Sequence, residues 1–364
     1  MSSSIIGTWP KLAKRLAILC ALAVSIAAQP RPQPPPPQGA VGEEEGPVVK
    51  NVGLSQVRFP VICATNRKWV NNAYSTLDRA TAEEPEFVLK YCTLDKSTHR
   101  LGDRSDAVFD KVLGKQPELD ALLAPAPPGQ VKRYLVYVHG FTSNFDQSFA
   151  SLAQLAFDIN RHSAPVLFSW PSGGNVAADY VAAKGNTRES GYKLAKTLEI
   201  LQNRANAPIE VDLVCHSLGS EVVMDGLQEL DTSRFQALQG KIRFKNIVFI
   251  APDIAELDFK RDTQWPVFGS TRTTLYTNAK DIILATPSAA VNYLERVGLK
   301  TDFFDPRVQN VDVTPLYLLP SADAHTSVLN QPMGLMDLYL LLKYDLGASE
   351  RNLYYLKNHW QIRR

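Results

Sequence analysis

The stretch from residue 209 to residue 222 restricts the fold of this chain more than any other feature, because an apolar run there ends abruptly on polar and small residues. Residues 209–214 are rich in β-branched side chains and are typical of a short buried strand. After His216-Ser217-Leu218-Gly219, apolar residues recur at roughly helical spacing over residues 222–230. The stretch therefore predicts a strand that turns sharply into a helix, with Ser217 at the corner.

A serine at such a corner is a candidate nucleophile. Its hydroxyl projects above the sheet, where a histidine from another loop can reach it, and the helix N-terminus offers backbone N–H groups to an oxyanion. This motif, the nucleophile elbow, is usually written G-x-S-x-G. Here Cys215 takes the place of the first glycine and Gly219 keeps the second. Taken alone, the motif also fits a structural serine in an ordinary turn, so the context has to decide.

Strand-like and helix-like segments alternate along the chain. The predicted strands are residues 57–64, 87–94, 134–138, 166–170, 209–214, 246–250, 273–276 and 308–313, and the predicted helices include residues 149–159, 192–201 and 335–342. The first two strands would form one edge of the sheet, and residues 308–313 would be the last strand. Such alternation predicts an α/β fold with a mostly parallel central sheet flanked by helices. We expect one domain over residues 51–364, without a large cap domain.

The N-terminal region has the order of a secretory signal peptide. Basic residues precede an apolar run over residues 16–28, which ends in small side chains and is shorter than the ~20 apolar residues that a spanning helix needs. We predict a signal peptide at residues 1–28, followed by a proline-rich, extended linker at residues 29–50. The protein would be exported, to the periplasm or the medium. An uncleaved leader that holds it at the membrane is the alternative.

Charge and cysteine content restrict partners and cross-links. The formal net charge of +2 is too small to indicate a nucleic-acid-binding protein, and charges of both signs are scattered along the chain. Cys63 and Cys92 lie on the two N-terminal strands, so a disulfide between them is one possibility in an oxidising compartment. Two reduced, packed cysteines are the alternative, since the mature chain would carry an odd number of cysteines.

A base and an acid are expected after the serine, in the order serine, acid, histidine. His325 fits the base, because it lies between the last predicted strand and the closing helix. His162 and His359 are better explained as surface or helix-packing residues. Two acids follow neighbouring strands, Asp281 after residues 273–276 and Asp253 after residues 246–250. We favour Asp281, because the later strand end is used more commonly, and keep Asp253 as the alternative acid.

The oxyanion donors are expected from two loops. In hydrolases of this architecture, one N–H comes from the residue after the nucleophile and the other from the loop after an earlier strand. Leu218 and Phe141 occupy these positions, the latter in His139-Gly140-Phe141 after the strand at residues 134–138. A glycine is useful there because the backbone must approach the substrate closely. His139 is more consistent with bracing this loop than with catalysis.

Several motifs together resemble one known family. They are Ala64-Thr-Asn-Arg67, His99-Arg-Leu-Gly102, His139-Gly-Phe141, Phe168-Ser-Trp-Pro-Ser172, His216-Ser-Leu-Gly219, Ala251-Pro-Asp253, Leu275-Tyr276 and His325. The chain from about residue 57 to 330 resembles the bacterial α/β hydrolases of unknown function that are usually secreted or lipid-anchored. The resemblance implies the α/β-hydrolase fold and a triad of Ser217, Asp281 and His325, but no substrate. Family members often carry Met and Asn where this chain has Leu218 and Ser220.

The expected activity is that of a serine hydrolase acting on a carboxylic ester. His325 would take the proton of Ser217, Asp281 would hold the imidazole in the right tautomer, and an acyl-enzyme would form and then be hydrolysed. We expect no metal and no cofactor, and a small-molecule or lipid ester as substrate. The alternative is a secreted, catalytically silent domain of the same fold that serves binding. The complete set of candidate catalytic residues argues against that alternative.

Overall fold

The computed structural model describes residues 50–51, 55–110, 113–160, 165–174, 177–287 and 294–363. The predicted signal peptide at residues 1–28 and the predicted linker up to residue 49 lie outside the described residues. The last residue of that linker, Lys50, lies in the first strand.

The strands are β1 (Lys50–Asn51), β2 (Gln56–Thr65), β3 (Arg67–Val70), β4 (Ala73–Arg79), β5 (Glu86–Asp95), β6 (Val108–Phe109), β7 (Lys132–Val138), β8 (Pro165–Ser169), β9 (Ile209–His216), β10 (Ile242–Ile250), β11 (Ser270–Thr277), β12 (Val308–Asp312), β13 (Leu353–Leu356) and β14 (His359–Ile362). The α-helices are α2 (Gln116–Leu123), α3 (Phe145–Asp158), α4 (Ala177–Ala205), α5 (Gly219–Leu230), α6 (Glu256–Asp262), α7 (Gln264–Gly269), α8 (Ile282–Pro287), α9 (Ser327–Asn330) and α10 (Pro332–Tyr344). The 3-10 helices are η1 (Arg104–Asp106), η2 (Ser233–Leu238), η4 (Val297–Leu299), η5 (Thr314–Leu316) and η6 (Asp323–Thr326).

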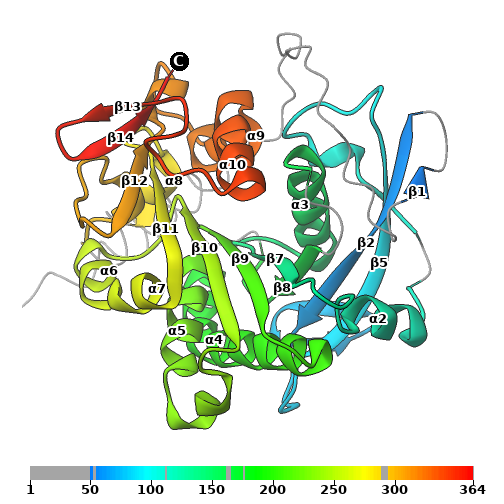
Figure 1. Cartoon of the computed structure of the whole chain (residues 1–364). Coiled ribbons are helices and arrows are strands. Elements are labelled where there is room, and N and C mark those ends of the chain that lie inside the picture. The colour runs from blue at the N-terminus through cyan, green and yellow to red at the C-terminus, as the bar shows by residue number, and fades with distance from the viewer. Residues whose placement is uncertain are drawn as a thin grey trace, which may run out of the picture.

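One large sheet organises the molecule, in the order β13-β14-β12-β11-β10-β9-β7-β8-β2-β5-β6, with β1 paired to β2 (Figure 1). From β2 to β14 every neighbouring pair is parallel, while β5, β6, β1 and β13 add antiparallel strands at the edges. The carboxyl ends of the parallel strands therefore lie along one side of the sheet, where side chains from several loops can meet. The predicted fold, a mostly parallel sheet flanked by helices, is confirmed.

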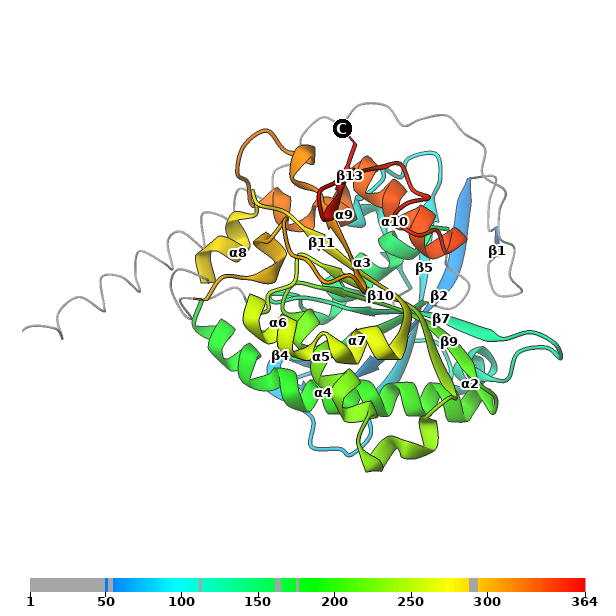
Figure 2. The same ribbon diagram turned by 60° about the vertical axis from the view of Figure 1, so that its left-hand side comes forward.

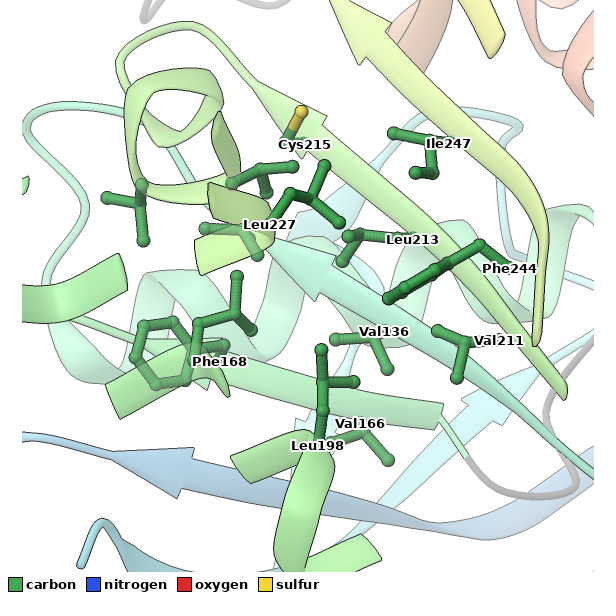
Figure 3. Packing of buried hydrophobic residues seen from close by; sticks show 14 of the residues in the cluster. Val136, Val166, Phe168, Leu198, Val211, Leu213, Cys215, Leu227, Phe244 and Ile247 are labelled. Atoms are coloured by element: carbon green, nitrogen blue, oxygen red, sulfur yellow. The ribbon is translucent and has the colours of Figure 1, made fainter. Parts of the chain in front are cut away.

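Helices cover both faces of the sheet. Helices α4 and α5 pack on one face, and α3 and α10 pack on the other, as two views show (Figures 1 and 2). Residues of β7, β8, β9 and β10 point alternately into the two cores, as the period of a strand requires. On the α4 and α5 side, Leu198 and Leu227 contact a layer that includes Val136, Leu213 and Phe244 (Figure 3).

The sheet extends beyond the strand that we predicted to be the last. After β12 and α10 the chain returns as the hairpin β13–β14, and β14 runs parallel to β12 at the edge. Each hairpin strand has four residues, and Lys357, at the turn, adopts a positive φ of 51° without being a glycine. The prediction that β12 is the last strand is therefore wrong. It failed because short strands joined by a turn without glycine give a weak sequence signal.

Helix α4 is longer than predicted, because it runs from Ala177 to Ala205 rather than over residues 192–201. Gly185 and Gly191 weaken the helical pattern in its first half. The structure explains Gly191, since a Cβ there would lie 2.5 Å from the Cβ of Asp225 in α5. The glycine lets the two helices approach closely, which is a packing requirement that no local pattern reveals.

The possible disulfide between Cys63 and Cys92 is contradicted by the strand register. Both cysteines are free and buried. In the β2–β5 ladder Cys63 faces Val88, whereas Cys92 faces Phe59. Four positions of a ladder separate the cysteines by about 13 Å, because a strand rises about 3.3 Å per residue, and a disulfide needs Cα atoms within about 7 Å. The alternative of two packed, reduced cysteines agrees with the structure.

The connection that leaves the carboxyl end of β10 forms only the helices α6 and α7 before β11 begins. Within the described ranges, no separate cap domain lies over the strand ends, as the fold prediction stated. In that same part of the chain, no helix has the length and apolar character needed to cross a bilayer.

Candidate active site

Ser217 lies at the corner between β9 and α5, as the sequence predicted. Its φ of 54° is positive, which is uncommon for a residue with a Cβ and is typical of a strained, functional turn. Two backbone bonds hold this conformation: the N–H of Ser217 donates to the carbonyl of Ile250 at 3.0 Å, and its own carbonyl accepts from the N–H of Asp253 at 3.2 Å. The loop after β10 therefore braces the elbow.

Close packing around the elbow explains its small residues. A Cβ on Gly219 would lie 2.4 Å from the carbonyl oxygen of His139, and a Cβ on Gly140 would lie 2.9 Å from the Cβ of Ser217. Cys215, which takes the place of the first glycine, is buried, and its Sγ lies 3.4 Å from the carbonyl oxygen of Val248. A small side chain thus fits between β9 and β10, so the substitution leaves the turn intact.

His325 and Asp281 meet at the carboxyl end of the sheet. The Nδ1 of His325 lies 2.6 Å from the Oδ2 of Asp281. The other carboxylate oxygen accepts from the backbone N–H groups of Ile283 and Leu284, at 2.9 Å and 3.0 Å, at the start of α8. An isolated bridge between Asp281 and Ser321 joins the two loops that carry the pair. With Nδ1 donating to the carboxylate, Nε2 is the nitrogen that can accept a proton.

The electrostatic surroundings favour the charged form of His325. Burial alone would lower the pKa of His325, but the charge and hydrogen bond of Asp281 and the charge of Asp253 together raise it above its ordinary value. An imidazolium would therefore be stabilised there, as a general base requires once it has taken a proton.

Asp253, the alternative acid, is engaged by other groups. Its Oδ1 lies 2.9 Å from the Nε of Arg296, and its Oδ2 accepts from the hydroxyl of Tyr180 at 2.8 Å. Both partners are buried. Among the described residues, it is Asp281 rather than Asp253 that forms the hydrogen bond with His325. The geometry thus agrees with the preferred acid, while Asp253 lies near enough to act on His325 through its charge.

His216 is a functional candidate to which sequence analysis assigned no role. Its Nε2 donates to the backbone carbonyl of His325 at 3.0 Å, and the two rings lie 4.7 Å apart between centroids. Burial, with a smaller effect of the neighbouring His325, lowers the pKa of His216 to about 3, so the ring is neutral and free to donate. His216 therefore ties the main chain of His325 to the residue that precedes Ser217. Its position next to the serine was the only available signal.

The loop after β7 is braced by buried polar groups. His139 is almost fully buried, and its Nδ1 donates to the carbonyl of Gly140 at 2.9 Å. Its Nε2 accepts from the backbone N–H of Trp170 at 3.1 Å, and the Nη2 of Arg67 lies 3.3 Å from the same nitrogen. Burial and the charge of Arg67 lower the pKa of His139 well below its usual value. His139 is thus a neutral bracing residue, which agrees with the interpretation from the sequence.

Arg67 crosslinks this loop to the rest of the molecule. Its guanidinium is buried and donates to the carbonyl of Ser143 at 2.7 Å, to the hydroxyl of Ser169 at 2.9 Å and to the carbonyl of Ser75 at 3.0 Å. These acceptors belong to the loop after β7, the end of β8 and the β3–β4 hairpin. Sequence analysis placed Arg67 only in a family motif and assigned no role to it.

The two predicted oxyanion donors belong to segments that adjoin Ser217. Leu218 follows it at the start of α5, and Phe141 lies next to Gly140, which closely approaches the serine. Within the described part of the chain, neither backbone N–H has a carbonyl or side-chain acceptor. The ring of Phe141 packs edge-on against Tyr180 at 5.4 Å. Two backbone donors therefore remain available close to the serine.

The remaining candidate histidines lie elsewhere. His162 is outside the described residues, and His359 is on β14, which lies beyond β12 and next to the edge strand β13. Among the described residues, no group of three or more His, Cys, Asp or Glu side chains is arranged to hold a metal ion.

Comparison with known families adds to this geometry. Residues 122–310, more than half of the chain, match the model of a family described as alpha/beta hydrolase of unknown function (DUF900). The chain belongs to this family. The match includes Ser217, Asp253 and Asp281 of this α/β hydrolase and ends before His325. Fold and family together support a hydrolase.

Two solved structures are similar to this α/β hydrolase. Lipase B of Aspergillus fumigatus shares 14% identity and a TM-score of 0.37, covering 64% of this chain and 58% of the lipase. The chain thus spans less than two thirds of that protein. Esterase B of Lactobacillus rhamnosis shares 11% identity and a TM-score of 0.39, covering 93% of this chain and 94% of the esterase. A search of curated proteins found no match.

Proposed function

We propose that this α/β hydrolase cleaves a carboxylic ester through an acyl-enzyme formed on Ser217. The observation that carries the proposal is the 2.6 Å contact between the side chains of His325 and Asp281. In addition, the backbone carbonyl of His325 accepts a hydrogen bond from His216, the residue before the serine. A structural serine in an ordinary turn requires neither this buried pair nor a positive φ at Ser217.

Each group has a definite task in the proposed reaction. His325 Nε2 takes the proton from Ser217 as the hydroxyl attacks the ester carbonyl, and Asp281 stabilises the resulting imidazolium. The N–H groups of Phe141 and Leu218 bind the oxyanion, where each donor is typically worth about 3–4 kcal/mol. The imidazolium then protonates the leaving alcohol. Water, activated by the same histidine, releases the acid.

Export and an ester of small-molecule or lipid type complete the proposal. They rest on the order of basic, apolar and small residues in residues 1–28 and on the apolar side chains near the site. N-terminal sequencing of exported protein is expected to begin near Gln29. Membrane-bound material that still begins at Met1 would replace cleavage with an anchor.

A fluorophosphonate probe tests the proposed chemistry directly. The wild-type protein is expected to be labelled on Ser217 and to hydrolyse p-nitrophenyl esters, whereas Ser217→Ala should do neither while remaining folded by circular dichroism. An ester series of increasing acyl length then defines the substrate class. A folded wild-type protein that the probe does not label would leave the catalytically silent binding domain as the better explanation.

A further inference from the structure

Two segments that flank the acid and the base expose only apolar side chains. In residues 279–285 and 318–320 the exposed side chains are those of Ala279, Ile282, Ala285, Leu318, Leu319 and Pro320. Leu318 and Leu319 are 72% and 75% exposed, among the most exposed large apolar residues of the described chain. We call these six residues the apolar rim. Soluble proteins leave single apolar residues exposed, but a group of this kind marks an interaction site.

The rim forms one continuous surface because the two segments are joined. The N–H of Ser321 donates to the carbonyl of Lys280 at 3.0 Å, and Asp281 pairs with Ser321 in a parallel bridge. The Nζ of Lys280 donates to the carbonyl of Tyr317, just before the two leucines. Ile282, at the start of α8 (Figure 2), is therefore a neighbour of the loop that carries Leu318 and Leu319.

Position and charge indicate what this surface fits. The rim directly adjoins Asp281 and lies on the loop that leads to His325, so a partner bound there would face the proposed site. In residues 279–286 and 314–323 the charged side chains are Lys280, the buried Asp281 and the partly buried Asp323. The exposed side chains of this surface are thus all apolar, with one lysine beside them, which fits a lipid surface where acyl chains bury leucines and anionic headgroups attract lysine.

We infer that the apolar rim docks this hydrolase on a phospholipid bilayer and so presents lipid acyl esters to Ser217. The inference rests on the proposed function for the chemistry, but not for the binding. Leu318 and Leu319 insert at the level of the headgroups and acyl chains, while Lys280 stays at the headgroups. The substrate class is then an ester within a lipid surface rather than a freely dissolved ester.

Binding is tested without turnover in the Ser217→Ala background, by co-sedimentation with vesicles of equal parts phosphatidylcholine and phosphatidylglycerol. The double change Leu318→Ser and Leu319→Ser is expected to lower the vesicle partition coefficient at least about tenfold, because two buried leucines are lost. The matched control, Val108→Ser with Val131→Ser, removes two side chains of 65% and 59% exposure, which lie away from the carboxyl ends of the strands. This control should bind vesicles as strongly as the parent protein, which carries only Ser217→Ala.

Three results would overturn the inference. They are failure of the parent to bind vesicles, unchanged binding of the rim variant, and equal loss in the control. Sedimentation velocity separates a further case, since a parent dimer that the rim variant converts to monomer would assign the rim to a second copy of this chain. Fluorophosphonate labelling of the wild-type protein without vesicles reports the proposed function independently. Vesicle binding without labelling would refute the proposed serine-hydrolase activity but would still support the apolar rim as a membrane-docking surface.

Discussion

At the scale of single residues, the two candidate acids of the site differ in the side chains and backbone groups that they bond to. Asp281 bonds to His325 and to the N-terminal N–H groups of α8, whereas Asp253 is paired with Arg296 and Tyr180. Chain order alone leaves both acids as candidates, because each follows a strand. Only the side-chain partners, which local sequence does not reveal, distinguish the acid that bonds to His325 from the acid that acts on it through its charge alone.

Replacing the two acids separately tests this distinction. Asp281→Asn is expected to lower the turnover of a soluble ester by about 10⁴-fold, because the histidine loses its orienting carboxylate. Asp253→Asn should keep most of the turnover and lose stability instead, because Arg296 is left buried without its partner. Circular dichroism verifies folding of both. The reverse pattern of rates would assign the acid to Asp253, and two active variants would refute the triad.

The pH dependence of kcat/KM reports the raised pKa of His325. Below that pKa the ring is protonated and cannot act as a base, so kcat/KM should rise with pH and reach half its plateau above about pH 6.5, the ordinary histidine value. Asp253→Asn should move this midpoint to lower pH, since it removes a negative charge that favours the imidazolium. An unchanged midpoint in a folded, active Asp253→Asn variant would show that Asp253 exerts no charge effect on the base.

At the scale of elements, the parallel strands and the sharp turn at Ser217 followed from apolar patterning, while the packing of elements against one another did not. The strands β7 to β12 were predictable, because both of their faces are buried and their sequences are therefore rich in β-branched residues. The hairpin β13–β14 was not predicted, because its turn has a positive φ without a glycine. The first half of α4 was not predicted, because Gly191, which close packing against α5 requires, has a low helix propensity. The role of Arg67 was also not predicted, because two of its acceptors, on Ser143 and Ser169, are distant from it in sequence.

The loop after β7 gives an element-scale prediction through Arg67. Arg67→Lys keeps the charge but cannot reach the acceptors on Ser143, Ser169 and Ser75 together, because an ammonium is a point charge and not a planar fork. The loop that carries Phe141 should then be less well positioned, and kcat should fall by about 10–100-fold, less than the roughly 10²–10³-fold cost of losing an oxyanion donor outright. KM should change little.

The control for this variant counts active sites. Turnover is divided by the fraction of protein that a fluorophosphonate labels, so that misfolded molecules do not contribute. Stability is measured separately by thermal unfolding. A folded Arg67→Lys variant with wild-type kcat would show that the loop keeps its position without the guanidinium.

At the scale of the whole molecule, ion pairs hold the C-terminal segment together and fasten it to the sheet. Arg133 pairs with Asp212 at 2.9 Å and with Asp345, after α10, at 2.6 Å. Arg351, just before β13, pairs with Asp337 of α10 at 3.0 Å. Helix α10 covers the face of the sheet that also packs α3, so these contacts tie the last part of the chain to the strands whose carboxyl ends carry the site.

The pair of Arg351 and Asp337 allows a test of what such a fastening contributes. Both side chains are almost completely buried, and Tyr276 donates to Asp337 at 2.6 Å. Burial raises the pKa of Asp337, with Arg351 and Tyr276 opposing. Removing only the arginine, as in Arg351→Met, leaves a buried carboxylate without its cation and should lower the free energy of unfolding by about 3–5 kcal/mol.

The double variant shows whether the stability lost in Arg351→Met comes from the unpaired charge or from lost packing. Asp337→Asn together with Arg351→Met removes both charges while the amide still accepts from Tyr276, so it should recover much of the stability lost in the single variant. Urea unfolding followed by circular dichroism measures both, and labelling of Ser217 per folded molecule should stay near the wild-type level, because the amide at position 337 still accepts from Tyr276 at the end of β11. If the two changes were simply additive, the ion pair would contribute no specific coupling, and packing around Arg351 would have to hold the C-terminal hairpin in place.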